Sequence, residues 1–341
     1  MTAPILVRDE GRALATVARI DGIAGIPGAD RIVAATVRGW TVVVGKGEFE
    51  VGQRVVFFEI DTALPVDDQR YAFLAPRGTK TYEGRDYHVL KTARLRGVYS
   101  QGLVLPLSLF FKDGAPEDGL DLTDRLDLYK WEQPLPAGQG QQAGPFTLLA
   151  RKTDSERVQN LADAWPSIQQ FHWYATEKVD GTSITIVRDY FGKHRVMSRN
   201  WEIAEGDNLY WRAAYASGLM DGLSYGDAIQ GEIVGPGIQG NRLGLSDVRV
   251  VVFDGWKDGQ LVSRGFWGPA ALALRAPRYD IPFPATPEEA VTQVDGIKSL
   301  LSPGHLAEGV VWHTMWGNTL RVLDGRSTFK VVSNKYLLKE K

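Results

Sequence analysis

The stretch E-K-V-D-G-T at residues 177–182 stands between two runs of strand-forming residues, 173–177 and 183–187. An Asp-Gly pair between such runs predicts a tight turn that joins two strands. A lysine at the end of the first strand, beside an acid and a glycine, would face a substrate while its stem stays packed. A plain hairpin turn produces the same short pattern, so the stretch alone leaves both interpretations open.

The residues around this turn predict a domain in which strands and helices are mixed. Further strand-like runs follow at residues 228–234, 249–253, 309–313 and 328–332, and helical spacing is present at 155–161 and 208–217. Because no regular strand-helix-strand alternation is present, we expect an α+β domain with antiparallel sheets rather than a doubly wound fold.

The first third of the chain predicts a small barrel. Short strand-like runs separated by Gly, Pro and Asp occupy residues 13–20, 32–37, 40–44, 54–60, 88–93 and 102–106. Five or six such strands fit an OB-like β-barrel. The segment P-L-P-A-G-Q-G-Q-Q-A-G-P at 134–145 has the composition of a linker, so we expect domains at 1–133 and 146–341.

Composition excludes several classes of protein. The 341 residues include no cysteine and only five scattered histidines, which argues against disulfides, thiolate chemistry and a zinc hydrolase. The longest apolar run, 103–111, is too short to span a membrane, and the N-terminal residues lack a signal-peptide pattern. We therefore expect a cytoplasmic protein.

A local excess of positive charge lies at residues 77–96, where six basic side chains stand against two acidic ones and give +4. The whole chain has a formal net charge of −2, so nucleic-acid contact would depend on such a patch. We expect Lys91, Arg94 and Arg96 to contact phosphates, while a solvated face without a ligand is the alternative.

Five short motifs follow K-x-D-G in a fixed order. They are S-R-N at 198–200, G-E-I-V at 231–234, V-F-D-G at 252–255, E-G-V-V at 308–311 and F-K-V-V at 329–332. In this order they resemble the covalent nucleotidyltransferase superfamily of polynucleotide ligases and capping enzymes. R-K-T-D-S-E-R-V-Q-N-L at 151–161 and S-N-K-Y-L at 333–337 resemble the Deinococcus-type ATP-dependent RNA ligases.

The resemblance implies an N-terminal OB-like β-barrel followed by an antiparallel-sheet nucleotidyltransferase domain of the ATP-grasp-like ligase kind. It implies that Lys178 attacks ATP to form lysyl-AMP, with Asp180 and Glu308 beside Mg²⁺ or Mn²⁺. Lys330 would neutralise the α-phosphate.

The nucleotide-binding set implied by the resemblance is wider. Glu232 and Arg199 would bind the ribose, Phe253 would stack on adenine, and Arg157 would hold pyrophosphate. Glu177 and Lys335 belong to the same set. Relatives often carry a second lysine two positions after the one matched by Lys330, where this chain has Val332; Lys335 is the candidate replacement.

Other interpretations remain open at this point. G-P-G-I-Q-G at 235–240 imitates a dinucleotide fingerprint with Asp254 downstream, although the sequence between them does not favour the required helix. An ATP-dependent DNA ligase and a non-catalytic OB protein are the alternatives to an RNA ligase. DNA ligases place an OB domain after the last motif, and the 11 residues that follow Lys330 cannot form one. We expect a monomeric RNA ligase that seals nicks with an RNA 3′-OH end and serves RNA repair.

Overall fold

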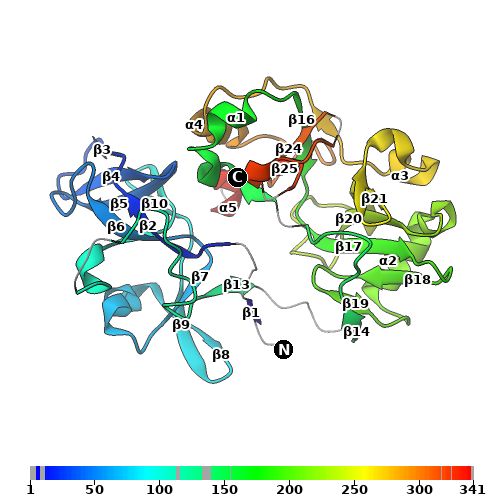
Figure 1. Cartoon of the computed structure of the whole chain (residues 1–341), viewed down its shortest axis with the longest axis horizontal. Helices are drawn as coiled ribbons and strands as arrows, with labels where there is room; N and C mark the ends of the chain where they lie inside the picture. Colours follow the sequence, from blue (N-terminus) through cyan, green and yellow to red (C-terminus); the bar gives the residue numbers. More distant parts are fainter. Residues whose placement is uncertain are drawn as a thin grey trace. The chain divides into compact units, whose positions relative to one another are not determined.

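The computed structural model describes residues 5–7, 12–112, 116–132, 140–153, 155–315, 317–323 and 325–338. The chain divides into two compact units, Met1–Pro136 and Ala137–Lys341 (Figure 1). This division lies inside the expected linker at 134–145, of which residues 134–139 lie outside the described residues. The linker is shorter than expected, because Gln142–Pro145 forms strand β14 and pairs with β19 (Trp201–Ile203).

The first unit contains two three-stranded antiparallel sheets that share one core. One sheet has the order β12 (Leu103–Pro106), β6 (Arg54–Phe58), β2 (Ala15–Arg19), and the other β3 (Gly22–Gly25), β4 (Ile32–Val37), β5 (Trp40–Gly45). Alternate residues of β5 are buried, which places Trp40, Val42 and Val44 against Phe57 and Val104 of the other sheet. The expected strands at 32–37 and 40–44 therefore form as half-buried strands.

The first unit also contains a five-stranded sheet and a hairpin. The sheet has the order β1 (Ile5–Val7), β13 (Tyr129–Glu132), β7 (Thr62–Pro65), β9 (Arg85–Val89), β8 (Lys80–Tyr82). The hairpin pairs β10 (Ala93–Leu95) with β11 (Val98–Ser100). The strand expected at 88–93 is β9, which begins earlier and ends at Val89. The 3₁₀ helix Gln69–Arg77 precedes the β8–β9 hairpin at the edge of this sheet.

The second unit is built from two sheets. The seven-stranded sheet has the order β14, β19, β18 (His194–Met197), β17 (Thr182–Arg188), β20 (Asp227–Val234), β21 (Arg249–Lys257), β22 (Gln260–Val262). The five-stranded sheet has the order β15 (Glu156–Arg157), β25 (Thr328–Val332), β24 (Gly309–Thr314), β16 (Trp173–Lys178), β23 (Arg278–Tyr279). All strand pairs in these two sheets are antiparallel except β15 with β25. This agrees with the antiparallel α+β domain expected from the sequence.

The α-helices of the described residues are short: α1 (Trp165–Ile168), α2 (Leu209–Ser217), α3 (Pro269–Ala273), α4 (Pro287–Val294) and α5 (Asn334–Leu337). Helix α2 agrees with the helix expected at 208–217; Asn208 caps its first turn and Gly218 ends it with φ 66°. The helix expected at 155–161 is wrong in its first half, because Glu156 and Arg157 extend along β25 before a 3₁₀ turn at Val158–Leu161. None of the described helices is long and apolar enough to cross a membrane.

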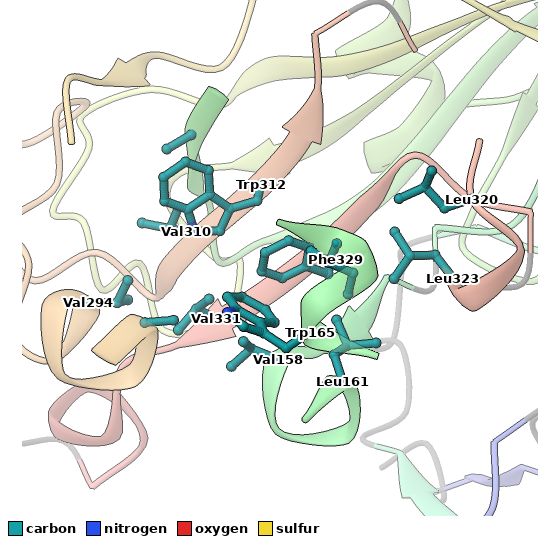
Figure 2. Close-up of a cluster of buried hydrophobic side chains, with 13 residues drawn as sticks. Val158, Leu161, Trp165, Val294, Val310, Trp312, Leu320, Leu323, Phe329 and Val331 are labelled. Atoms are coloured by element: carbon teal, nitrogen blue, oxygen red, sulfur yellow. The ribbon is translucent and has the colours of Figure 1, made fainter. Parts of the chain in front are cut away.

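The five-stranded sheet has one apolar face. Ala175, Val310, Trp312, Phe329 and Val331 point from it into a core that α1, α4 and the 3₁₀ turn complete with Trp165, Val294, Val158 and Leu161 (Figure 2). Because side chains alternate along a strand, the intervening residues of β16 and β25, including Lys178 and Lys330, point to the opposite face. Because one face of the sheet is buried in the core, the side chains on the opposite face are the ones that a ligand can contact.

Candidate active site

Lys178 is the last residue of β16 and lies opposite Gly309 of β24. Its Nζ donates a hydrogen bond of 2.5 Å to Oε2 of Glu308, the residue just before β24. A Cβ at Gly309 would lie 2.0 Å from the carbonyl oxygen of Val331, so only glycine permits this close packing against β25. The glycine of E-G-V-V therefore allows Glu308 to come beside the lysine.

The turn after β16 joins the two sheets of the second unit. A Cβ at Gly181 would lie 2.2 Å from the carbonyl oxygen of Ile233 and 2.8 Å from Cγ of Glu232, so the turn touches β20 directly. Asp180 accepts a 2.5 Å hydrogen bond from the Tyr336 hydroxyl at Oδ2. Burial and the nearby charge of Glu308 raise the pKa of Asp180, and the Tyr336 hydrogen bond opposes this shift.

Glu232 is brought to the same place by β20, where it lies opposite Ser183. Burial raises the pKa of Glu232 to about 8, and repulsion from Glu308 and Asp180 adds to this effect. The positive charges of Lys178 and Arg199 act in the other direction. Residues from motifs spread over 131 positions of the sequence, 178–308, therefore lie within electrostatic reach of one another.

A divalent cation fits this arrangement. Asp180, Glu232 and Glu308 all lie within electrostatic reach of Lys178; repulsion from Glu308 raises the pKa of Asp180, and repulsion from both raises that of Glu232. In the part of the chain that the structure describes, no three acidic or histidine side chains are close enough to enclose a metal ion. A cation here would keep most of its water and use one or two carboxylates, for which Glu308, the hydrogen-bond partner of Lys178, and Asp180 are the candidates.

Lys330 and Arg157 lie along the same sheet. Lys330 of β25 is opposite Val311 of β24, which is opposite Thr176 of β16, and Arg157 of β15 is paired with Lys330. Thr176 and Lys178 share one face of β16, so strand register places Lys330 on the face that carries Lys178. Two cationic residues thus border one side of the site, as a phosphate chain would require.

Phe253 follows a β-bulge in the seven-stranded sheet. Gly231 pairs with Val252 and Gln230 pairs with Asp254, so Phe253 is the extra residue between them. A bulge of this kind turns a side chain away from the regular alternation. Phe253 is half-buried and packs against a cluster that contains Val179, which places an aromatic ring beside the residue that follows Lys178.

Glu177 and Lys335, which the sequence analysis expected to contact the nucleotide, lie among other residues in the structure. The carboxylate of Glu177 lies on the core side of β16 and accepts hydrogen bonds from Ser299 Oγ at 2.5 Å and Leu300 N at 2.7 Å. Its side chain holds the turn after Lys298 and is not part of the Lys178 group. Lys335 packs along Gly296, where an added Cβ would lie 3.1 Å from Lys335 Cδ and 3.2 Å from its Nζ.

Tyr336 and Arg242 are site residues that the sequence motifs did not identify. Tyr336 belongs to the S-N-K-Y-L segment, but the motif drew attention to its lysine. Arg242 donates a 2.6 Å hydrogen bond from Nη2 to the carbonyl oxygen of Tyr336 and lies 3.4 Å from the centroid of the Tyr336 ring. Arg242 follows the G-x-G-x-x-G segment. A dinucleotide site would need a helix after that segment, and the fully described connection between β20 and β21 contains none.

The basic residues expected to contact nucleic acid lie in the first unit. Lys91 forms a 2.7 Å ion pair with Asp61, and the Arg94 guanidinium lies 5.5 Å from the centroid of the Tyr99 ring. Arg96 is in the turn of the β10–β11 hairpin with φ 49°. All three side chains are exposed and belong to the first unit, whereas Lys178 belongs to the second.

Two family models match the chain. One described as an OB-fold domain covers residues 14–107, and one described as RNA ligase covers residues 171–332. The first match confirms the OB-like barrel expected from the sequence. The second spans the strands that carry Lys178, Glu232, Glu308 and Lys330. No protein of curated function matches the chain significantly.

Solved structures of an RNA ligase from Naegleria gruberi are similar along nearly the whole chain. The structure with PPi has a TM-score of 0.85 and 35% identity, over 96% of this chain and 98% of that chain. A lysine-to-alanine variant with ATP and Mn has the same values. Another lysine-to-alanine variant with ATP and Mn has a TM-score of 0.83 and 33% identity, over 99% of both chains. The similarity therefore includes both units.

Proposed function

Because this chain belongs to the RNA ligase family, we propose that it seals breaks in RNA through AMP attached covalently to Lys178. The observation that carries the proposal is the position of Lys178, which hydrogen-bonds to Glu308, interacts electrostatically with Asp180 and Glu232, and lies on the sheet face that also bears Lys330. A structural lysine would have no need of three carboxylates and a neighbouring cation.

The first step is the attack of Lys178 Nζ on the α-phosphorus of ATP. A phosphorus–nitrogen bond forms, the bond to the β-phosphate oxygen breaks, and pyrophosphate leaves with that electron pair. The amine must lose its proton first, and Glu308 accepts a hydrogen bond from it at 2.5 Å. Lys330 on the same sheet face disfavours a second positive charge at Lys178 and stabilises the phosphate.

The next two steps move AMP and then release it. A 5′-phosphate oxygen of the polynucleotide attacks the phosphorus of lysyl-AMP, and Lys178 Nζ leaves with the bonding electrons. The 3′-hydroxyl of the other end then attacks the activated 5′-phosphate, so that a phosphodiester forms and AMP leaves. A divalent cation held by Asp180 and Glu308 would supply positive charge beside the reacting phosphate.

The remaining groups position the nucleotide. We assign the ribose to Glu232 and Arg199, the adenine ring to Phe253, and the departing pyrophosphate to Arg157. Glu177 supports the strand end by holding the 299–301 turn. The role of Lys335 in phosphate binding stays a prediction.

The relatives support ATP as the nucleotide and a divalent metal as cofactor. Structures of the Naegleria ligase include complexes with ATP and Mn, with AMP and Mn, and with PPi. Replaced residues in that enzyme include a lysine and the aspartate two positions after it, the spacing of Lys178 and Asp180. We therefore assign ATP and Mn²⁺ or Mg²⁺ to this chain.

A labelled-ATP experiment tests the covalent step. The protein incubated with α-labelled ATP and Mn²⁺ should become labelled at Lys178 through a bond that is labile to acid and stable to alkali. Lys178→Ala should remove the label, while Lys257→Ala, which changes a surface lysine paired with Asp227, should retain it. Label in Lys178→Ala, or preference for GTP over ATP, would contradict the proposal.

The substrate is proposed to carry a ribonucleotide at the 3′-hydroxyl side of the break. The 2′-hydroxyl is the group by which proteins distinguish RNA from DNA. Four nicked duplexes with RNA or DNA independently on each side test this requirement. Sealing should need RNA at the 3′-hydroxyl end and accept either strand at the 5′-phosphate end, whereas equal rates on all-DNA nicks would indicate a DNA ligase.

A further inference from the structure

The hydroxyl of Tyr336 is the only group that hydrogen-bonds to the Asp180 carboxylate within the described ranges. It donates to Oδ2 at 2.5 Å, across 156 residues of sequence. Oδ1 of the same carboxylate accepts no hydrogen bond in those ranges. One oxygen is therefore held by the tyrosine, while the carboxylate as a whole interacts electrostatically with Lys178 and Glu308.

Tyr336 is itself held on two sides. Its ring is buried, with 4% of the residue exposed, and the Arg242 guanidinium covers the ring at 3.4 Å from its centroid. The same arginine donates to the Tyr336 carbonyl oxygen at 2.6 Å. A ring clamped in this way has little freedom, so the hydroxyl points in one direction.

We propose that Tyr336 is a positioning residue that orients Asp180 for the divalent cation, and that Arg242 keeps the tyrosine in place. The proposal rests on the function given above, in which Asp180 helps to hold the metal. Groups that hydrogen-bond to a metal-binding side chain fix its direction, and their loss weakens metal binding without removing a ligand. Tyr336 acts on Asp180 in this way through the hydroxyl alone.

Anchoring of helix α5 does not account for the hydroxyl. Ser333 Oγ accepts from Tyr336 N at 3.2 Å, and Asp295 accepts from Lys335 N at 2.8 Å. The backbone of Ser333 also donates to the Glu308 carbonyl oxygen at 2.9 Å. Since these bonds hold α5 without the hydroxyl, Tyr336→Phe should fold and keep the ring under Arg242.

The test measures binding of Mn²⁺ directly. Free Mn²⁺ gives an electron paramagnetic resonance signal that is lost on binding, so titration with AMP present, which chelates Mn²⁺ only weakly and cannot be transferred to Lys178, gives the affinity without turnover. Tyr336→Phe should bind Mn²⁺ about 10-fold more weakly than the wild type. Tyr279→Phe is the matched control, because it removes a 2.7 Å hydrogen bond from a tyrosine hydroxyl to the Lys298 carbonyl oxygen on the other face of the sheet.

A double variant separates positioning of Asp180 from an independent effect. If the hydroxyl acts through Asp180, Tyr336→Phe should weaken Mn²⁺ binding no further in an Asp180→Asn background. Unchanged Mn²⁺ affinity in Tyr336→Phe, or losses that multiply in the double variant, would overturn the proposal. Failure of the wild type to form lysyl-AMP would instead contradict the proposed function, since the titration does not depend on that step.

Discussion

Lys178 Nζ and Glu308 Oε2 lie 2.5 Å apart, with 24% and 16% of their side chains exposed. The pair links the last residue of β16 to the residue just before β24, its neighbour in the sheet. Both side chains are partly exposed, so a ligand can reach them. Because burial is incomplete, the carboxylate can exchange the ammonium group for a hydrated cation when nucleotide binds. We therefore expect Glu308 to have two partners at different stages of the proposed reaction.

Glu308→Gln should reduce metal-dependent AMP transfer to Lys178 by about 10- to 100-fold. The amide keeps the shape of the side chain but loses the negative charge, so a loss as large as that of Glu308→Ala would show that charge dominates. The rate of label transfer is measured against Mn²⁺ concentration. Glu202→Gln, which alters an ion pair with Arg195 in the other sheet, is the control, and near-normal rates in both Glu308 variants would contradict the metal role.

Gly181→Ala should destabilise the second unit by ~1–3 kcal/mol, because the added Cβ would overlap the Ile233 carbonyl oxygen and Glu232. The turn can accept the methyl group only if β16 and β20 move apart, so AMP transfer should fall as well. Thermal melting and the adduct assay measure the two effects. Gly304→Ala, where nothing lies within 4 Å of the added atom, should change neither; equal behaviour of the two variants would refute the close-contact explanation.

Stability should fall as pH rises from about 5 to about 8, and Glu232 should be a main cause. The folded state raises the pKa of Glu232 from 4.5 to about 8, so in this window the folded chain holds a proton that the unfolded chain has lost. The unfolded state binds fewer protons, and stability therefore decreases by at most about 1.4 kcal/mol per pH unit.

Melting temperatures of the wild type and Glu232→Gln across this range measure the effect. The glutamine cannot ionise, so the melting temperature of Glu232→Gln should change less with pH than that of the wild type. Each kcal/mol of difference in unfolding free energy should separate the two melting temperatures by ~2–4 °C. Parallel curves for the two proteins would contradict the predicted ionisation. The titration is best made without metal or nucleotide, which would bind to the folded state and shift both curves.

A chain that begins at residue 134 should keep AMP transfer and lose most nick sealing. Residues 137–341 form a compact unit with hydrophobic clusters of its own, so we expect this part to fold alone. AMP transfer needs only nucleotide and metal, whereas the later steps need a bound polynucleotide. Full nick sealing by the shortened chain would overturn the assignment of nucleic-acid engagement to the first unit.

Replacement of Lys91, Arg94 and Arg96 by alanine should weaken RNA binding and flatten its salt dependence. Each lost phosphate contact should change the slope of log affinity against log salt by about 0.7–0.9. The ion pair of Lys91 with Asp61 means that this lysine must exchange partners on binding. Alanine at Arg31 and Lys46, two basic residues elsewhere in the first unit, is the control; an unchanged slope in the triple variant would indicate a solvated face.

Strands were the part of the fold that the sequence could predict best. The run 32–37 coincides with β4, because a short apolar run rich in β-branched residues is typical of a strand. The short motifs singled out Lys178, Glu232 and Glu308, and the structure brings these three within electrostatic reach of one another, while their roles stay predictions. Strand β14 was missed because Q-A-G-P has no apolar alternation, and it is held by backbone pairing at a sheet edge.

Contacts between distant segments could not be predicted. Tyr336 and Arg242 reach Asp180 only because α5 and the loop after β20 fold onto the same turn, and no local pattern encodes that meeting. The position of Glu177 is different. Its proximity to Lys178 in sequence suggested a shared role, but neighbours on a strand face opposite ways, so strand parity alone could have assigned Glu177 to the core side.

The pleat of β16 also determines which genetic changes the chain can survive. Deletion or insertion of one residue within Trp173–Lys178 would exchange the two faces, so that Glu177 would enter the nucleotide side and Lys178 would be forced among Trp312, Phe329 and Val310. A point substitution in this strand changes one side chain, whereas a change of length moves the following side chains of the strand to the opposite face of the sheet. Divergence among ligases built on this sheet should therefore accumulate length changes in the turns and almost none inside β16, β24 and β25.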